Sequence, residues 1–137
     1  MPQRPETAPV HAYPNAKVDS GVFPTRVGDI EEILLDFEWT YAVGNTTAKT
    51  TTDESELKDS NLNANVALDM FLDKDEDKAK DSQLASTEIM VWFAAYGPAT
   101  QPIGFKKKLD SVELDGTTFV LYSGKNGLAI DVNTKDQ

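Results

Sequence analysis

The stretch Ser86-Thr-Glu-Ile-Met-Val-Trp-Phe-Ala-Ala-Tyr-Gly97 decides the fold of this chain. Its apolar, β-branched and aromatic residues follow one another between a serine and a glycine, a pattern that predicts a β-strand. Successive side chains on a strand point to opposite faces. We therefore expect Ile89, Val91 and Phe93 to share one face and to form a stripe in the hydrophobic core.

The opposite face of this strand carries a carboxylate. Glu88 lies there beside the thioether of Met90 and the indole of Trp92. Apolar and aromatic neighbours partly desolvate a carboxyl group and raise its pKa, unless hydrogen bonds or a cation offset the effect. Such tuning suits acids, bases and nucleophiles, so Glu88 is a candidate catalytic group on a cleft floor. The alternative is that Glu88 is a solvated residue on the outer face of a sandwich.

Composition limits the partners that this chain can bind. Its 137 residues are enough for one domain, and 39% hydrophobic with 26% charged residues is ordinary for a globular protein. A formal net charge of -10 argues against nucleic acid, because binding to phosphates depends on Lys and Arg. The apolar runs are too short for a bilayer, so no membrane partner is expected. The absence of cysteine excludes disulfides and thiol nucleophiles.

Residues 1–16 are rich in proline and are predicted to form an extended or disordered lead-in. The single histidine, His11, is interpreted as a solvated imidazole. The first ten residues contain no apolar core segment, so we expect no signal peptide in them. The sequon at Asn45 would fit secretion, although such triplets arise by chance in Thr-rich loops.

A second strand is predicted at residues 65–72. Alternation directs Val66, Leu68 and Met70 toward the core and Asp69 toward the other face. Asp69 is therefore a second acid on a non-core face, although an isolated carboxylate at such a position is usually a solvated strand residue.

Residues 29–41 begin like a helix and then alternate like a strand, so we predict a turn or helical bend that leads into a strand. The polar tract 43–63 is predicted to be a long surface loop. The acids of residues 73–81 suggest the start of a calcium loop. However, Lys78 and Leu84 occupy positions that require Gly and Glu, which favours a solvated hairpin loop.

The C-terminal third contains turns and short strands. Residues 97–104 are rich in turn formers, and Asp115-Gly116 between 111–114 and 117–122 is a strong hairpin signal. A further strand is predicted at 128–132. Short strands separated by turns indicate an all-β sandwich.

The order of these motifs resembles glycoside hydrolase family 12, the endo-β-1,4-glucanases that include xyloglucan-specific enzymes. Each motif alone is common, and the resemblance rests on their order and spacing from about Tyr13 onward. The matching segments are Phe37-Glu-Trp-Thr-Tyr41, Ala64-Asn-Val-Ala-Leu-Asp-Met-Phe71, Glu88-Ile-Met-Val-Trp-Phe-Ala-Ala-Tyr-Gly97, Gln101-Pro-Ile-Gly104 and Leu121-Tyr-Ser-Gly-Lys-Asn-Gly127.

The resemblance implies a jelly-roll sandwich of two antiparallel sheets with a concave cleft for a glucan chain. It implies that two carboxylic acids hydrolyse β-1,4-glucosidic bonds with retention of configuration. By matching positions, Glu88 is the nucleophile, Asp69 supports it, and Trp92, Met90 and Trp39 bind the substrate. The resemblance implies no cofactor or metal, and we expect a monomer that acts outside the cell on β-1,4-glucan or xyloglucan.

The family's acid/base lies in a Gly-Thr-Glu-Pro-Phe-like motif, which has no match in the 137 residues. We therefore expect residues 17–137 to be a partial family 12-like β-sandwich domain without its acid/base. Two hypotheses remain open: a β-glucan hydrolase, or a catalytically inactive relative that binds glucan or a protein partner of the active enzyme. A third is a structural domain in which Glu88 is incidental.

Overall fold

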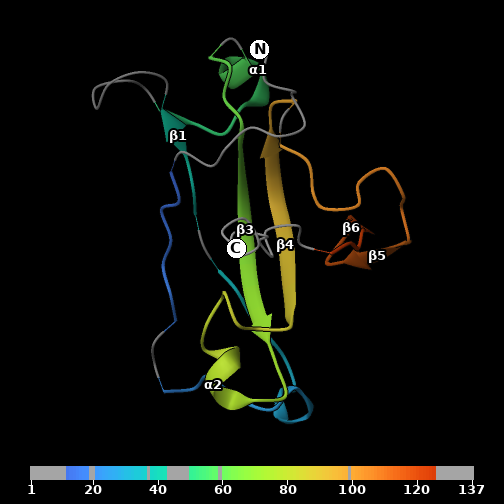
Figure 1. Ribbon diagram of the computed structural model, residues 1–137. Helices are drawn as coiled ribbons and strands as arrows, with labels where there is room; N and C mark the ends of the chain where they lie inside the picture. Colours follow the sequence, from blue (N-terminus) through green and yellow to red (C-terminus); the bar gives the residue numbers. More distant parts are fainter. Residues whose placement is uncertain are drawn as a thin grey trace, which may run out of the picture. The chain divides into compact units, whose positions relative to one another are not determined.

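A computed structural model describes residues 12–18, 21–36, 38–42, 50–58, 60–98 and 100–125. The chain forms two compact units, residues 1–100 and 101–137, and each is described by itself. The described residues form three two-stranded antiparallel sheets with few and short helices (Figure 1). The all-β antiparallel class expected from the sequence is confirmed, and it is consistent with a β-sandwich. His11, the sequon at Asn45 and the strand expected at 128–132 lie outside the described residues.

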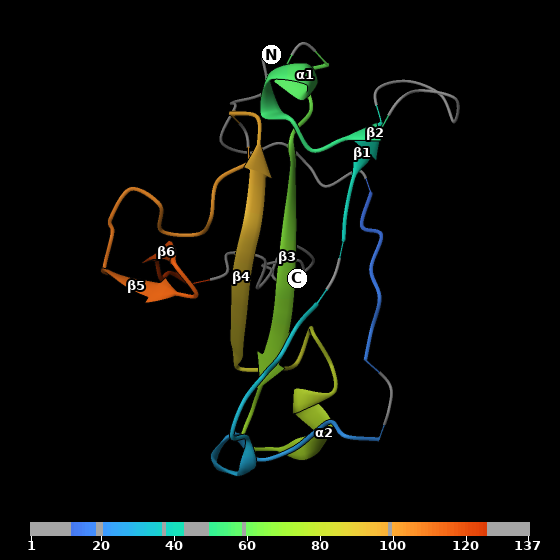
Figure 2. The same ribbon diagram turned by 180° about the vertical axis from the view of Figure 1, so that it is seen from behind.

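The first unit is built on the long antiparallel pair β3 (Ala64–Leu72) and β4 (Thr87–Tyr96), which Figures 1 and 2 show from opposite sides. Both strands were predicted from alternation. Their register pairs Ala64 with Tyr96 at one end and Leu72 with Thr87 at the other. The helix α2 lies at the second end in both views, and α1 lies near the first.

A β-bulge interrupts this pair. Val66 is opposite Ala94 whereas Ala67 is opposite Trp92, so Phe93 is an extra residue on β4. A bulge of this kind changes which face the following residues occupy. Beyond it, Tyr96 shares a face with Val66, although strict alternation from Trp92 would put Tyr96 on the face of Trp92.

The predicted core stripe is wrong for two of its three residues. Ile89 is 43% exposed and Phe93 is 41% exposed. Tyr96 is instead buried at 5% exposure, because the bulge directs its ring into the packed end of the pair. The buried centre of the described residues therefore lies at the end of β4, not along its middle.

The helix α1 (Glu54–Lys58) supplies the other buried side chain. Leu57 is 2% exposed, and α1 packs against β4. The Tyr96 hydroxyl donates a hydrogen bond to the carbonyl oxygen of Thr52, just before the helix, at 3.3 Å. Burial of Leu57 and Tyr96 thus joins α1 to the end of the long pair.

The expectation of a surface loop over 43–63 is wrong where the structure describes that tract. It contains α1 and the strand β2 (Thr50–Thr51), which pairs with β1 (Tyr41–Ala42). The Asp53 carboxylate accepts hydrogen bonds from the amides of Ser55 at 2.7 Å and Glu56 at 3.4 Å, as an N-cap does. Asp53 followed three residues later by Glu56 is a capping signature hidden in polar composition.

The turn expected near Asp29 is the 3₁₀ helix η1 (Val27–Asp29). The strand expected after it is regular only at β1, and the described residues from Glu31 to Trp39 form no ladder. The charged loop after β3 contains the short helix α2 (Glu76–Ala79). Asp75 caps α2 by accepting hydrogen bonds from the amides of the second and third residues of the helix.

The second unit contains the predicted hairpin of β5 (Asp110–Leu114) and β6 (Thr117–Leu121). Asp115 and Gly116 connect the strands with φ values of 47° and 74°. Two successive positive φ angles define a type I′ turn, and an Asp-Gly pair favours it. Among the helices that the structure describes, none is both long and apolar enough to cross a membrane.

Candidate active site

Both acids singled out from the sequence lie on the same face of the β3–β4 pair. Asp69 is opposite Met90, and Phe71 is opposite Glu88. Side chains of opposed residues point to the same side of a sheet, so Asp69 and Glu88 are diagonal neighbours. The Cα atoms of such neighbours are about 7 to 8 Å apart, within reach of two acid side chains. Trp92, opposite Ala67, continues the same face.

Met90 and Trp92 contact each other on this face. The indole Nε1 of Trp92 donates a hydrogen bond to the Sδ atom of Met90 at 3.5 Å. Thioether sulfur is a weak acceptor, so this bond orients the side chains more than it stabilises the fold. The two predicted substrate contacts form an apolar surface beside the acids.

The two oxygen atoms of Asp69 have different surroundings. Oδ2 accepts a hydrogen bond from the hydroxyl of Tyr13 at 3.1 Å. Oδ1 is shielded from solvent and has no hydrogen-bond partner among the described residues. The side chain as a whole is half-buried, whereas Glu88 is exposed. The structure therefore combines one shielded acid with one accessible acid.

Tyr13 is a site residue that our residue-by-residue reasoning missed. It lies in the segment 12–18, which forms no helix or strand and was assigned to the lead-in. Burial raises the pKa of the Tyr13 phenol from 10.0, and the charge of Asp69, its hydrogen bond and the charge of Glu88 raise it further. Both acids therefore act on this phenol. The only signal in the sequence was that the family resemblance begins near Tyr13.

Trp39 lies in a different cluster. Its ring makes edge-to-face contacts with Tyr41, at 6.0 Å between centroids, and with Tyr96, at 5.9 Å. Tyr41 and Tyr96 are 5.3 Å apart in a similar geometry, and burial is the main cause that raises the pKa of both phenols. According to the register of β3 and β4, the side chain of Tyr96 lies on the opposite face of the pair from Glu88. The structure thus does not bring Trp39 together with the acids, and its role as a substrate contact stays a prediction.

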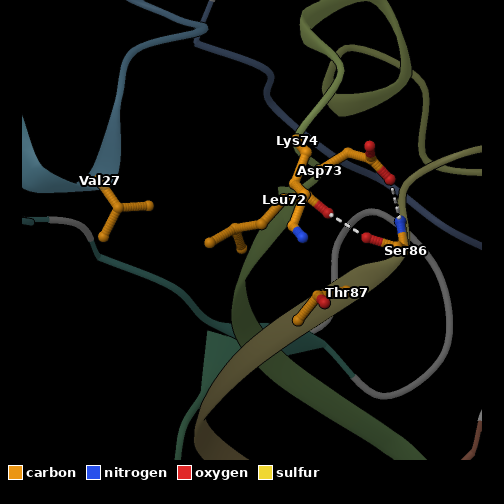
Figure 3. A pocket seen from close by; sticks show the side chains of 6 residues that line it. All are labelled: Val27, Leu72, Asp73, Lys74, Ser86 and Thr87. Atoms are coloured by element: carbon orange, nitrogen blue, oxygen red, sulfur yellow. Dashed lines mark hydrogen bonds between the residues drawn. The ribbon is translucent and has the colours of Figure 1, made fainter.

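The pocket in Figure 3 is not the candidate active site. It has a volume of about 250 Å³ and is lined by Val27, Leu72, Asp73, Lys74, Ser86 and Thr87. Leu72 and Thr87 are a register pair next to Phe71 and Glu88, so alternation places them on the other face. Hydrogen bonds from Ser86 to Asp73 and to the Leu72 carbonyl close one side of it (Figure 3). The pocket is a packing feature at the α2 end of the pair.

No metal centre is built into the described part of the chain. Within those residues, no group of three or more His, Cys, Asp or Glu side chains could hold a metal ion. Asp69 and Glu88 are a pair of acids beside a phenol and a thioether. Carboxyl groups in general can transfer protons or attack as nucleophiles.

Residues 10–134 match the sequence model of glycosyl hydrolase family 12, and the chain belongs to this family. The match covers β3, β4 and both acids. The match confirms the family that the order of the motifs predicted. The chain is therefore a glycoside hydrolase-like protein.

Curated relatives agree with the family assignment. A xyloglucan-specific endo-β-1,4-glucanase A of Aspergillus niger is 30% identical over 118 residues, 86% of this chain and 40% of the relative. The enzyme of that name from Emericella nidulans is 32% identical over the same shares. An inactive glycoside hydrolase of Phytophthora nicotianae is 31% identical over 104 residues, 76% of this chain and 42% of the relative. The chain thus spans about two fifths of the relatives it matches, and no solved structure matches it significantly.

Proposed function

We propose that the face bearing Asp69 and Glu88 is the nucleophile half of an active site that hydrolyses internal β-1,4-glucosidic bonds in glucan or xyloglucan. The observation that carries the proposal is the register of β3 and β4, which makes the two acids diagonal neighbours in a chain of family 12. The names of the Aspergillus niger and Emericella nidulans relatives support xyloglucan as the substrate class. The proposed site of action is outside the cell, where such polymers occur.

In the proposed mechanism, a carboxylate oxygen of Glu88 attacks the anomeric carbon as the bond to the leaving oxygen breaks. A glycosyl ester forms, and water then hydrolyses it, so the configuration is retained. Glu88 must be ionised to attack, and a proton held by Asp69 removes the repulsion between two like charges. We further propose that Trp92 and Met90 form the apolar floor against which the sugar rings pack.

The acid/base that a retaining mechanism also needs is not assigned to any residue of this chain. General acid catalysis contributes on the order of 10² to 10⁴ in rate. We therefore expect this chain by itself to cleave xyloglucan negligibly. A protein of the same sequence that also carries the family's acid/base motif is expected to cleave xyloglucan.

A mechanism-based inhibitor tests Glu88 without the acid/base. A 2,4-dinitrophenyl 2-deoxy-2-fluoro-β-cellobioside has a leaving group that departs without protonation, and the fluorine slows hydrolysis of the ester. Incubation should add one glycosyl group to the chain, and peptide mass spectrometry should locate it on Glu88. Glu88→Gln should abolish the adduct.

Asp77→Asn is a matched control, because it removes one carboxylate from a side chain that is 95% exposed on α2. It should leave labelling unchanged. An unlabelled wild-type chain, or a label on another residue, would remove Glu88 from the proposed role.

The alternative function is a catalytically inactive relative that binds glucan or a protein partner of the active enzyme. Similarity to the inactive glycoside hydrolase of Phytophthora nicotianae favours this alternative. Affinity electrophoresis in gels that contain xyloglucan distinguishes the two. Retarded migration without covalent labelling supports a binding protein, whereas labelling of Glu88 supports the hydrolase.

A further inference from the structure

Tyr13 joins the candidate site from a distant part of the sequence. It is separated from Asp69 by 56 residues, and the residue is 64% exposed. Tyr13 loses conformational entropy when it is held against a strand, because its side chain is exposed and its segment is irregular. The contact must offset this cost. The hydrogen bond to Asp69 is the contact that offsets this cost, so its role in the site has to be explained.

The two carboxylate oxygen atoms of Asp69 differ in their hydrogen-bond partners, and this difference indicates the role of Tyr13. Tyr13 occupies Oδ2 at 3.1 Å, while Oδ1 is shielded from water and unpartnered among the described residues. A shielded carboxylate oxygen without a donor is unfavourable, so a proton donor is expected to use it. Met90, opposite Asp69, has no donor group, and Trp92 already donates to Met90. Glu88 is the diagonal neighbour on the same face, and its carboxyl group can carry a proton.

Resting on the proposed function, we propose that Tyr13 is a positioning residue for the pair of acids. Its phenol holds Oδ2 of Asp69 and leaves Oδ1 to accept the proton of the Glu88 carboxyl group. The proton moves from Glu88 to Oδ1, and Glu88 becomes the carboxylate that attacks. Tyr13 does not touch the reacting atoms, and its effect passes through Asp69.

Electrostatics supports this arrangement. Burial and the charges of Asp69 and Glu88 raise the pKa of Tyr13 above 10.0. Among the residues that the structure describes, these two acids are the titratable groups that raise it. A phenol with the ordinary pKa of 10.0 is already protonated across the neutral range, and the raised pKa extends the range in which Tyr13 remains a donor.

The first test measures the Tyr13 phenol in the complete chain. Labelling tyrosine at 13Cζ gives one NMR signal for each of the four tyrosines, and Tyr13→Phe assigns the signal of Tyr13. Asp69→Asn should lower the pKa of Tyr13 toward 10, and Glu88→Gln should lower it by less, because its charge is the smallest of the causes. Tyr41, whose pKa is raised by burial, should not respond. A Tyr13 titration identical in wild type and Asp69→Asn would overturn the contact.

The second test asks whether Tyr13 acts on Glu88. The phenol donates to the Asp69 carboxylate and so sets how strongly Asp69 competes with Glu88 for their shared proton. Tyr13→Phe should therefore shift the Glu88 titration, which carboxyl 13C NMR follows. Tyr122→Phe removes a phenol from the second unit and should shift nothing. An unchanged Glu88 titration in Tyr13→Phe would overturn the positioning role.

Neither NMR test requires catalysis. If Glu88 resists the inhibitor but responds to Tyr13→Phe, the proposed function fails and the positioning role stands. If Glu88 is labelled but does not respond, the positioning role alone is wrong.

Discussion

The β3–β4 pair and the β5–β6 hairpin are both antiparallel, but they obtain their register in different ways. Two residues with positive φ connect β5 to β6, and the type I′ turn itself aligns the strands. Fourteen residues including α2 separate β3 from β4. A connection of that length leaves the register open, so contacts elsewhere must set it.

Contacts at both ends of the β3–β4 pair can set its register. At one end, α1 carries the buried Leu57 and packs against β4, and Tyr96 contacts the rings of Trp39 and Tyr41. At the other, the Asp73 carboxylate accepts a hydrogen bond from the Ser86 amide at 3.0 Å. The comparison teaches that the candidate site depends on long-range contacts, since a one-residue slip would move one acid to the other face.

Leu57→Ala should destabilise the β3–β4 pair relative to the β5–β6 hairpin more than the other substitutions below. It removes the most buried side chain of the described residues, and such truncations cost about 2 to 5 kcal/mol. We expect about 2 kcal/mol, because a thin core can collapse around the lost volume. Amide hydrogen exchange should show lost protection in β3 and β4 but not in β5 and β6. Leu34→Ala, at a side chain 82% exposed, is the matched control and should be close to neutral.

Gly116→Ala should produce the opposite pattern with a smaller effect. Gly116 has a φ of 74°, which costs a residue with a side chain about 1 kcal/mol. Exchange should accelerate in β5 and β6 and stay unchanged in β3 and β4. Gly28→Ala tests the same substitution at a glycine without positive φ and with open space around it, and it should not accelerate exchange. Equal loss of protection in both pairs would contradict independent registers.

Asp73→Asn should have the smallest effect on stability, and this effect should appear only in how the stability of the α2 end depends on pH. Hydrogen bonds from the amide of Asp75 and from Ser86 hold the pKa of Asp73 below its ordinary value of 3.8. A lowered folded-state pKa contributes stability that is present above 3.8 and is lost as pH falls through the folded value.

The protection factor of the Ser86 amide, which is its exchange rate corrected for the intrinsic pH dependence, should therefore fall on acidification of the wild type. The variant should lack this fall. Asp36→Asn, at an exposed acid, should behave like the wild type. If the pH dependence of Asp73→Asn matched the wild type, the carboxylate contact would not stabilise the α2 end.

Much of the fold could be predicted because the signals are local. Alternation placed β3 and β4, and Asp115-Gly116 placed the hairpin, since strand period and turn chemistry need only neighbouring residues. The helix α1 was missed although Asp53 and Glu56 carry a capping signature, because polar composition dominated the interpretation of that tract. Its stability also depends on the packing of α1 against β4 and on the burial of Leu57, which no local pattern shows.

The candidate site divides in the same way. The sequence by itself determined that Asp69, Glu88, Met90 and Trp92 lie on non-core faces of two strands, because side-chain direction in a strand follows the period of two. Only the tertiary structure decided that the two faces are one, since that depends on which strands pair and in what register.

The tertiary structure also decided the positions of three aromatic residues. The bulge at Phe93 moved Tyr96 into the buried end, Trp39 packed there with it, and Tyr13 reached Asp69 across 56 residues. None of these placements follows from neighbouring residues, because each depends on chain segments that meet only after folding. The sequence therefore determined which chemical groups the site could use, and the long-range contacts determined which of them meet.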